Sequence, residues 1–118
     1  MQRSLVDLLA RSVRQQPLAE ALVQAERRIS YAELWRACTA VAQRLRHEGL
    51  QPGERVGLLL KASPEYVAAY YGALAAGAVV VPLNVDARAC TIGGWLRHCD
   101  ARFLISASYL AWPAIETA

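Results

Sequence analysis

The most apolar part of the chain follows Glu65, and no charged residue occurs again before Asp86. Its first part predicts a helix, because Ser63 can cap the N-terminus and Pro64 suits the first turn. Glu65 favours the positive end of the helix dipole, and Gly77 is placed to end the helix. A helix that is apolar on nearly all sides is buried on several of them. This segment therefore predicts the centre of the core.

Three apolar segments without polar alternation predict buried strands, at Arg55 to Leu60, Ala78 to Leu83 and Arg102 to Ile105. The apolar helix separates the first two strands. A shorter helix over Thr91 to Cys99, weakened by Gly93-Gly94, separates the last two. This order predicts the α/β class: a three-layer parallel sheet flanked by helices on both faces, with right-handed crossovers. We expect the strands to be parallel neighbours and the apolar helix to pack on them.

The N-terminal part of the chain predicts a helix that ends before Pro17, followed by a hairpin. The apolar face of this helix consists of Leu5, Leu8, Leu9 and Val13. The hairpin strands are predicted at Ala21 to Gln24 and Arg28 to Ser30, about the turn Ala25-Glu26-Arg27.

A second amphipathic helix begins at the capping box that Ser30 forms with Glu33, and Gly49 closes it. The turn Gln51-Pro-Gly-Glu54 then leads into the first buried strand. The apolar face of the helix consists of Leu34, Cys38, Val41 and Leu45.

The composition suits one domain or part of one. Of 118 residues 55% are hydrophobic, and the mean hydropathy is +0.19, which suits a piece that packs against another. The formal net charge is +3, and every basic residue except Lys61 is an arginine. These basic residues are scattered among acidic ones, so we expect no nucleic-acid binding, which needs clustered charge.

Targeting signals are not expected from this sequence. The N-terminus is amphipathic and charged, unlike a signal peptide. The uncharged stretch from Tyr66 to Val85 has about the length of a membrane span, but Gly77 and Pro82 split it into two elements. An odd number of cysteines without metal-ligand spacing indicates a reduced, cytoplasmic setting. These cysteines are Cys38, Cys90 and Cys99.

The histidines and cysteines offer weak candidates for catalysis. His47 lies in the last turn of a helix, where a cation is favoured, so a capping role is preferred to a catalytic one. His98 and Cys99 suggest a thiolate pair, with Cys90 nine residues earlier, but adjacent helical residues do not face each other. Cys38 belongs to the apolar stripe of its helix and is expected in the core.

Ser63 opens a helix directly after a parallel strand, where free N–H groups can bind an anion. The alternative is plain capping, which is favoured because Lys61-Ala-Ser63 has no glycine to admit a phosphate. Gly93-Gly94 matches no nucleotide fingerprint. Capping also explains the carboxylates of Asp7, Glu33 and Glu65, which leaves no pair for acid–base catalysis. No residue is therefore assigned a catalytic, cofactor-binding or metal-binding role.

Four motifs in a fixed order give the chain a resemblance that covers nearly its whole length, from Leu5 to Ile105. These are Tyr31-Ala-Glu-Leu34, Gly49-Leu-Gln-Pro-Gly-Glu-Arg-Val56, Ser63-Pro-Glu-Tyr66 and Gly77-Ala-Val-Val-Val-Pro-Leu-Asn84. Together they resemble the start of the acyl-adenylate-forming (AMP-dependent) synthetases and ligases. That family includes acyl-CoA synthetases and the adenylation domains of peptide synthetases.

The resemblance implies a parent enzyme that activates a carboxylic acid with ATP and Mg²⁺ as acyl-AMP. It then passes the acyl group to the thiol of CoA or of a phosphopantetheine carrier. Family members carry a Gly/Ser/Thr-rich phosphate loop ending in Pro-Lys, an Asp that holds the ribose, and a late catalytic Lys. None of these motifs occurs in residues 1–118. The chain is thus expected to be a partial adenylation domain, the N-terminal scaffold portion, inactive by itself and partnered by the remainder of the enzyme.

Asn84-Val-Asp-Ala87 leaves the carboxyl end of a predicted strand, where open sheets place ligands. Family members often read Asn-Pro-Arg-Leu here, and in some CoA ligases the basic residue approaches the nucleotide end of CoA. This chain has Asp86 at that place, and a carboxylate would repel a phosphate. Arg88 can substitute from two residues on, and a polar turn is the alternative.

If the chain is part of a larger enzyme, one apolar face should be left uncovered, so the chain should self-associate. The candidate contributors to this face are Tyr70 or Tyr71 and the tail residues Tyr109, Leu110, Trp112 and Ile115.

Two other functions stay open. One is a stand-alone, non-catalytic protein-interaction module, which would need a large exposed apolar face. The other is a small doubly wound nucleotide-binding domain of another class, although no Gly-rich turn follows a strand.

Overall fold

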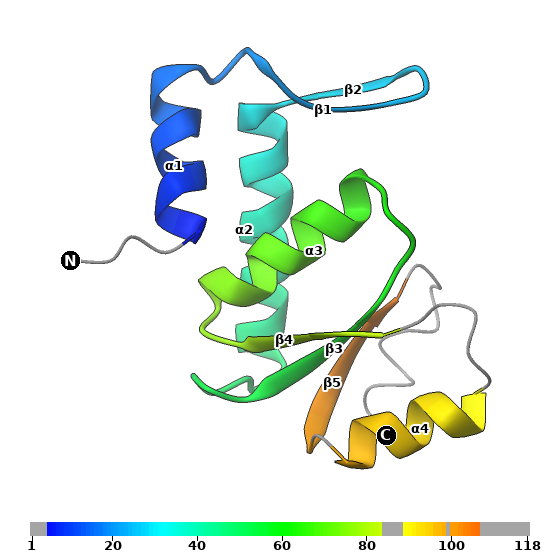
Figure 1. The fold of residues 1–118 in the computed structure, drawn as a ribbon. Coiled ribbons are helices and arrows are strands. Elements are labelled where there is room, and N and C mark those ends of the chain that lie inside the picture. The colour runs from blue at the N-terminus through cyan, green and yellow to red at the C-terminus, as the bar shows by residue number, and fades with distance from the viewer. Residues whose placement is uncertain (1–4, 84–88, 99, 107–118) are drawn as a thin grey trace.

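The computed structural model describes residues 5–83, 89–98 and 100–106 (Figure 1). Its elements follow the predicted order, and most ends differ from the predicted ones by one or two residues. In chain order they are α1 (Leu5–Gln15), β1 (Glu20–Gln24), β2 (Arg27–Ser30), α2 (Tyr31–His47), β3 (Arg55–Leu59), α3 (Pro64–Ala75), β4 (Val79–Pro82), α4 (Ala89–His98) and β5 (Ala101–Ser106).

The three apolar strands form one parallel sheet in the order β4-β3-β5, which confirms the predicted fold class. Val56 of the central strand pairs with Val80 on one side and Phe103 on the other, and its side chain is fully buried. The helix α3 packs on β3 and β4, as predicted, and α4 contacts β5. In Figure 1, α3 lies above the sheet and α4 below it.

Helices α2 and α3 pack closely against each other, and Gly72 of α3 makes this possible because it has no side chain. A Cβ atom on Gly72 would lie 2.6 Å from the Val41 Cβ and 2.8 Å from the Cys38 carbonyl oxygen. Both distances are shorter than a van der Waals contact, so no larger residue fits there without moving α2. The main core lies between these helices and the sheet. Its buried members include Ala42, Leu45, Leu50, Val56, Leu58, Ala69, Ala73 and Phe103.

A second apolar cluster joins α1, α2, α3 and the β1–β2 hairpin. Its buried members are Leu9, Leu34, Cys38 and Ala68. The predicted apolar face of α1 is only partly covered, since Leu5 and Leu8 are 49% and 46% exposed. The reason is that α1 packs against α2 and α3 along one side, through Leu9 and Val13.

The predicted start of α2 and the predicted glycine stops of α2 and α3 are confirmed. Ser30 and Glu33 form the reciprocal capping box of α2. Gly49 and Gly77 follow α2 and α3 with φ of +97° and +91°, a conformation that glycine adopts without strain. In the hairpin, Gln24 pairs with Arg27, so the turn is one residue shorter than predicted.

The uncharged stretch after Glu65 is split as predicted into α3 and β4. Within the described ranges, no helix is long and apolar enough to cross a membrane. Tyr70 and Tyr71, the expected contributors to an uncovered apolar face, are both partly buried, and they pack against the first and the second core cluster, respectively. The residues of the expected tail face lie outside the described part of the chain.

Candidate functional site

The carboxyl edge of the parallel sheet is the place where open α/β sheets bind ligands. At this edge β3 leads through Lys61, Ala62 and Ser63 into α3. The Ser63 hydroxyl accepts a hydrogen bond from the Tyr66 N–H at 3.1 Å and donates one to the Lys61 carbonyl at 2.9 Å. Ser63 therefore caps α3, as the favoured interpretation predicted.

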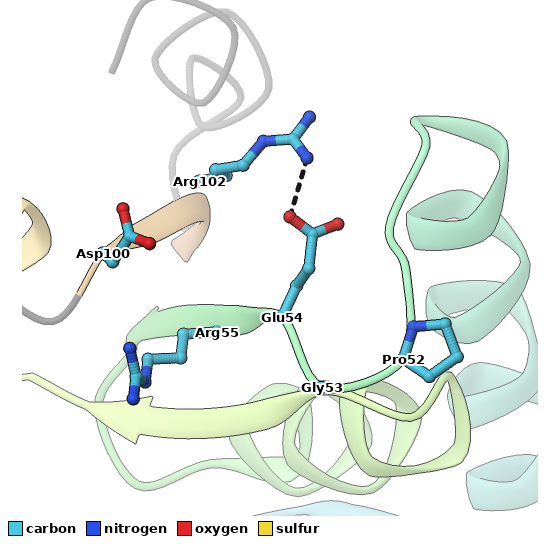
Figure 2. A pocket seen from close by; sticks show the side chains of 6 residues that line it. All are labelled: Pro52, Gly53, Glu54, Arg55, Asp100 and Arg102. Atoms are coloured by element: carbon cyan, nitrogen blue, oxygen red, sulfur yellow. Dashed lines mark hydrogen bonds and ion pairs between the residues drawn. The ribbon is translucent and has the colours of Figure 1, made fainter.

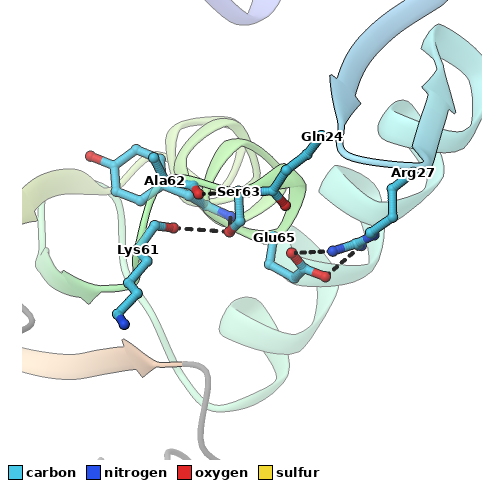
Figure 3. Close-up of polar contacts among 7 residues, drawn as sticks. Gln24, Arg27, Lys61, Ala62, Ser63 and Glu65 are labelled. Carbon is cyan, nitrogen blue, oxygen red and sulfur yellow. Dashed lines mark hydrogen bonds and ion pairs between the residues drawn. The ribbon is translucent and has the colours of Figure 1, made fainter.

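The tip of the β1–β2 hairpin docks beside this cap (Figure 3). The Arg27 guanidinium donates two hydrogen bonds to the Glu65 carboxylate, one from each terminal nitrogen. The Gln24 Nε2 donates to the Ala62 carbonyl oxygen at 3.0 Å. Arg27 holds the pKa of the Glu65 carboxyl below its usual range. Two residues of the hairpin thus contact the residues on either side of Ser63.

The opposite, amino edge of the sheet carries an open cavity of about 330 Å³ (Figure 2). Its lining consists of Pro52, Gly53, Glu54, Arg55, Asp100 and Arg102. In Figure 2, Glu54 and Arg102 point toward each other from the starts of β3 and β5, and the Arg102 Nη1 lies 2.7 Å from the Glu54 Oε2.

The Glu54 carboxylate also accepts a hydrogen bond from the Gln51 N–H at 2.8 Å. The pKa of Glu54 lies below its usual range for two reasons. The hydrogen bond from Gln51 is the larger one, and the hydrogen bond from Arg102 is the smaller one. The charges of the Glu54–Arg102 pair neutralise each other, and the cavity lies at the edge opposite to the usual ligand side. The lining of this cavity therefore does not indicate which class of ligand it would bind.

Sequence reasoning missed this cavity because it treated Gln51 to Glu54 as a turn alone. The available signal was the parallel pairing of the first and last apolar strands. Parallel neighbours begin at the same edge, which brings Glu54, Asp100 and Arg102 together.

The remaining candidates lie apart from one another. His47 ends α2 and is exposed, consistent with its predicted place in the last turn. Cys38 is buried as predicted, and burial raises the pKa of its thiol to about 11. Cys90 and His98 are exposed on α4, at opposite ends of the helix.

Several candidates fall outside the described residues, namely Asn84, Asp86, Arg88 and Cys99. Among the residues that the structure does describe, no group of three or more His, Cys, Asp or Glu side chains could hold a metal ion.

Comparison with known proteins shows the family to which this chain belongs. The model of a family described as AMP-binding enzyme matches residues 9–117. Pyochelin synthetase PchE of Pseudomonas aeruginosa is 41% identical over 70 residues, which are 59% of this chain and 5% of that protein. Phenyloxazoline synthase MbtB of Mycobacterium tuberculosis is 42% identical over 83 residues, which are 70% of this chain and 6% of that protein. The chain thus spans a small part of the length of these relatives.

Solved structures show the same similarity. The N-terminal subdomain of NpsA from Klebsiella oxytoca, in complex with 3-hydroxyanthranilyl-AMSN, matches with a TM-score of 0.83 and 32% identity. The match covers 94% of this chain and 28% of that one. The nonribosomal peptide synthetase FmoA3, in an AMPPNP-bound form, matches with a TM-score of 0.85 and 30% identity. This match covers 92% of this chain and 12% of that one. The chain therefore has the fold of part of such an N-terminal subdomain.

Proposed function

Because the chain belongs to the AMP-binding enzyme family, we propose that it is the N-terminal scaffold portion of an AMP-forming ligase. The whole enzyme would activate a carboxylic acid with ATP as acyl-AMP and transfer the acyl group to a thiol. The observation that carries this proposal is the match to the NpsA N-terminal subdomain across 94% of the chain. The AMPPNP-bound form of FmoA3 supports ATP as the nucleotide.

A carrier-protein thiol is the acceptor that we propose, in preference to CoA. Two of the relatives that the chain resembles, PchE and MbtB, are synthetases of which the matched residues make up only 5% and 6%. The chain also matches NpsA-ThdA, an artificially fused Adenylation-PCP di-domain, with a TM-score of 0.84 and 30% identity over 92% of its length and 21% of that chain. An acyl-CoA synthetase remains the alternative. A cytoplasmic setting belongs to the same proposal, because the reaction consumes ATP.

The contribution of these residues would be structural. The buried β3 and the close packing of α2 with α3 form a firm unit, against which the nucleotide-binding part of the enzyme would pack. The phosphate loop, the metal ligands and the catalytic Lys would lie in the remainder of the enzyme. ATP and the acid would therefore not be bound by residues 1–118 alone.

Two observations test this proposal. Purified residues 1–118 should not exchange pyrophosphate into ATP with any carboxylic acid, and clear exchange by a contaminant-free sample would contradict the scaffold role. The reading frame after codon 118 should continue into a Gly/Ser/Thr-rich loop that ends in Pro-Lys. A stop codon close behind would instead support the stand-alone interaction module.

A further inference from the structure

The β1–β2 hairpin is held to the rest of the chain in two different ways. Its base packs into the second apolar cluster through Ala21, Leu22 and Ile29. At its tip, Gln24 and Arg27 are exposed and make the polar contacts to Ala62 and Glu65. The tip can therefore change its contacts without opening the apolar core.

The tip contacts fall on both sides of one cap. Gln24 bonds to the carbonyl of Ala62, which precedes Ser63, and Arg27 bonds to Glu65, which follows it. The contacts at Ala62 and Glu65 bridge 38 residues of sequence. They tie the loop after β3 and the first turn of α3 to an element that comes before both.

We propose that Gln24 and Arg27 are positioning residues, through which the hairpin tip fixes the loop Lys61–Ser63 and the first turn of α3 at the carboxyl edge of the sheet. The assumption that ligands bind at this edge of the sheet rests on the proposed function. The positioning role of Gln24 and Arg27 rests only on their contacts with Ala62 and Glu65.

The residue types fit this role. A guanidinium can donate two parallel hydrogen bonds to one carboxylate, which fixes the direction of the pair as well as its distance. Both partners are about half exposed, with 49% for Arg27 and 54% for Glu65, so solvent weakens the pair. Its effect on the stability of the whole fold should accordingly be small, and its effect should be strongest at the cap and first turn of α3.

Amide hydrogen exchange, measured by NMR on the full chain, tests this proposal without any ligand. The reporters are the amides of Tyr66 and Val67, which bond to the Ser63 side chain and backbone. Arg27→Gln should speed their exchange by about two- to five-fold, the range expected for one exposed, well-aligned ion pair. The Tyr66 amide proton should also move upfield as its bond to Ser63 weakens, while the amides of β3 stay unchanged.

Arg28→Gln is the matched control. Arg28 is the next residue of the same strand and pairs with Glu20 inside the hairpin, 2.7 Å away. This variant should leave Tyr66 and Val67 as in the unmodified chain. Arg27→Lys should restore part of the protection, because an ammonium group keeps the charge but not the two-pronged geometry.

A double-mutant cycle identifies the contact itself. If Arg27 acts through Glu65, then Arg27→Gln should have no further effect in a chain that already carries Glu65→Gln. Unchanged Tyr66 exchange in Arg27→Gln, or equal acceleration in Arg28→Gln, would overturn the proposal. Neither result depends on adenylation chemistry, so a failure of the proposed function would leave these exchange rates as they are.

Discussion

The close approach of α2 and α3 gives a sharp prediction about Gly72. In an exposed helix, replacing Gly by Ala stabilises the chain by about 1 kcal/mol. At Gly72 the new Cβ would lie 2.6 Å from the Val41 Cβ and 2.8 Å from the Cys38 carbonyl oxygen. Neither atom is the free end of a flexible side chain, so the helices must separate. Overpacking of this kind costs about 3 kcal/mol at the upper end of its usual range, which leaves a net loss of about 2 kcal/mol.

Urea unfolding followed by circular dichroism measures this loss. For a small domain, about 2 kcal/mol lowers the midpoint by about 1 M urea. Gly94→Ala is the matched control, since Gly94 lies within α4 and a Cβ there would meet no atom within 4 Å. That variant should be as stable as the unmodified chain or slightly more stable. A Gly72→Ala chain with an unchanged or higher midpoint would refute the close-packing argument.

Three further predictions concern the thiols, the ion pair and the cap. At pH 8, iodoacetamide should label Cys90 in the folded chain and reach Cys38 only on unfolding, because Cys38 is buried and its pKa is raised to about 11. Peptide mass spectrometry distinguishes the two labelled cysteines, and labelling of Cys38 in the folded chain would contradict its burial. The lowered pKa of Glu65 means that its pair with Arg27 stabilises the folded chain above the ordinary carboxyl pKa of 4.5, and this contribution is lost as the pH falls through the lowered value. The difference in unfolding free energy between the unmodified chain and Glu65→Gln should therefore be present at neutral pH and shrink in acid, whereas a difference independent of pH would argue against the pair. Ser30→Ala should lower the unfolding free energy by about 1 kcal/mol through loss of the α2 capping box, and an unchanged urea midpoint would show that this cap contributes nothing.

The elements of this fold could be predicted because their ends depend on local chemistry. Ser63 and Gly77 mark α3, and Ser30 with Glu33 marks the start of α2, each through contacts with residues close in sequence. The apolar, non-alternating strands predicted the parallel sheet for the same reason, since burial on both faces is visible in each strand alone.

Contacts between distant segments could not be predicted in this way. The role of Gly72 depends on the path of α2, and sequence alone does not give the distance between two helices. The pairs of Arg27 with Glu65 and of Glu54 with Arg102 join residues 38 and 48 positions apart. Each of these side chains appeared only as a turn, cap or strand residue in its local pattern. The sequence therefore predicted that Ser63 caps α3 at the candidate site. It did not predict that the β1–β2 hairpin contacts the residues on both sides of that cap.

The central claim is that this chain can serve as the N-terminal scaffold of an adenylation domain. The most direct test replaces the matching segment of Klebsiella oxytoca NpsA by residues 5–106 of this chain and measures binding of 3-hydroxyanthranilyl-AMSN by calorimetry, with unmodified NpsA as the control. If these residues supply scaffold alone, the chimaera should fold and bind the ligand within about tenfold of NpsA, a difference of about 1.4 kcal/mol. A chimaera that fails to fold, or that folds and does not bind, would contradict the account.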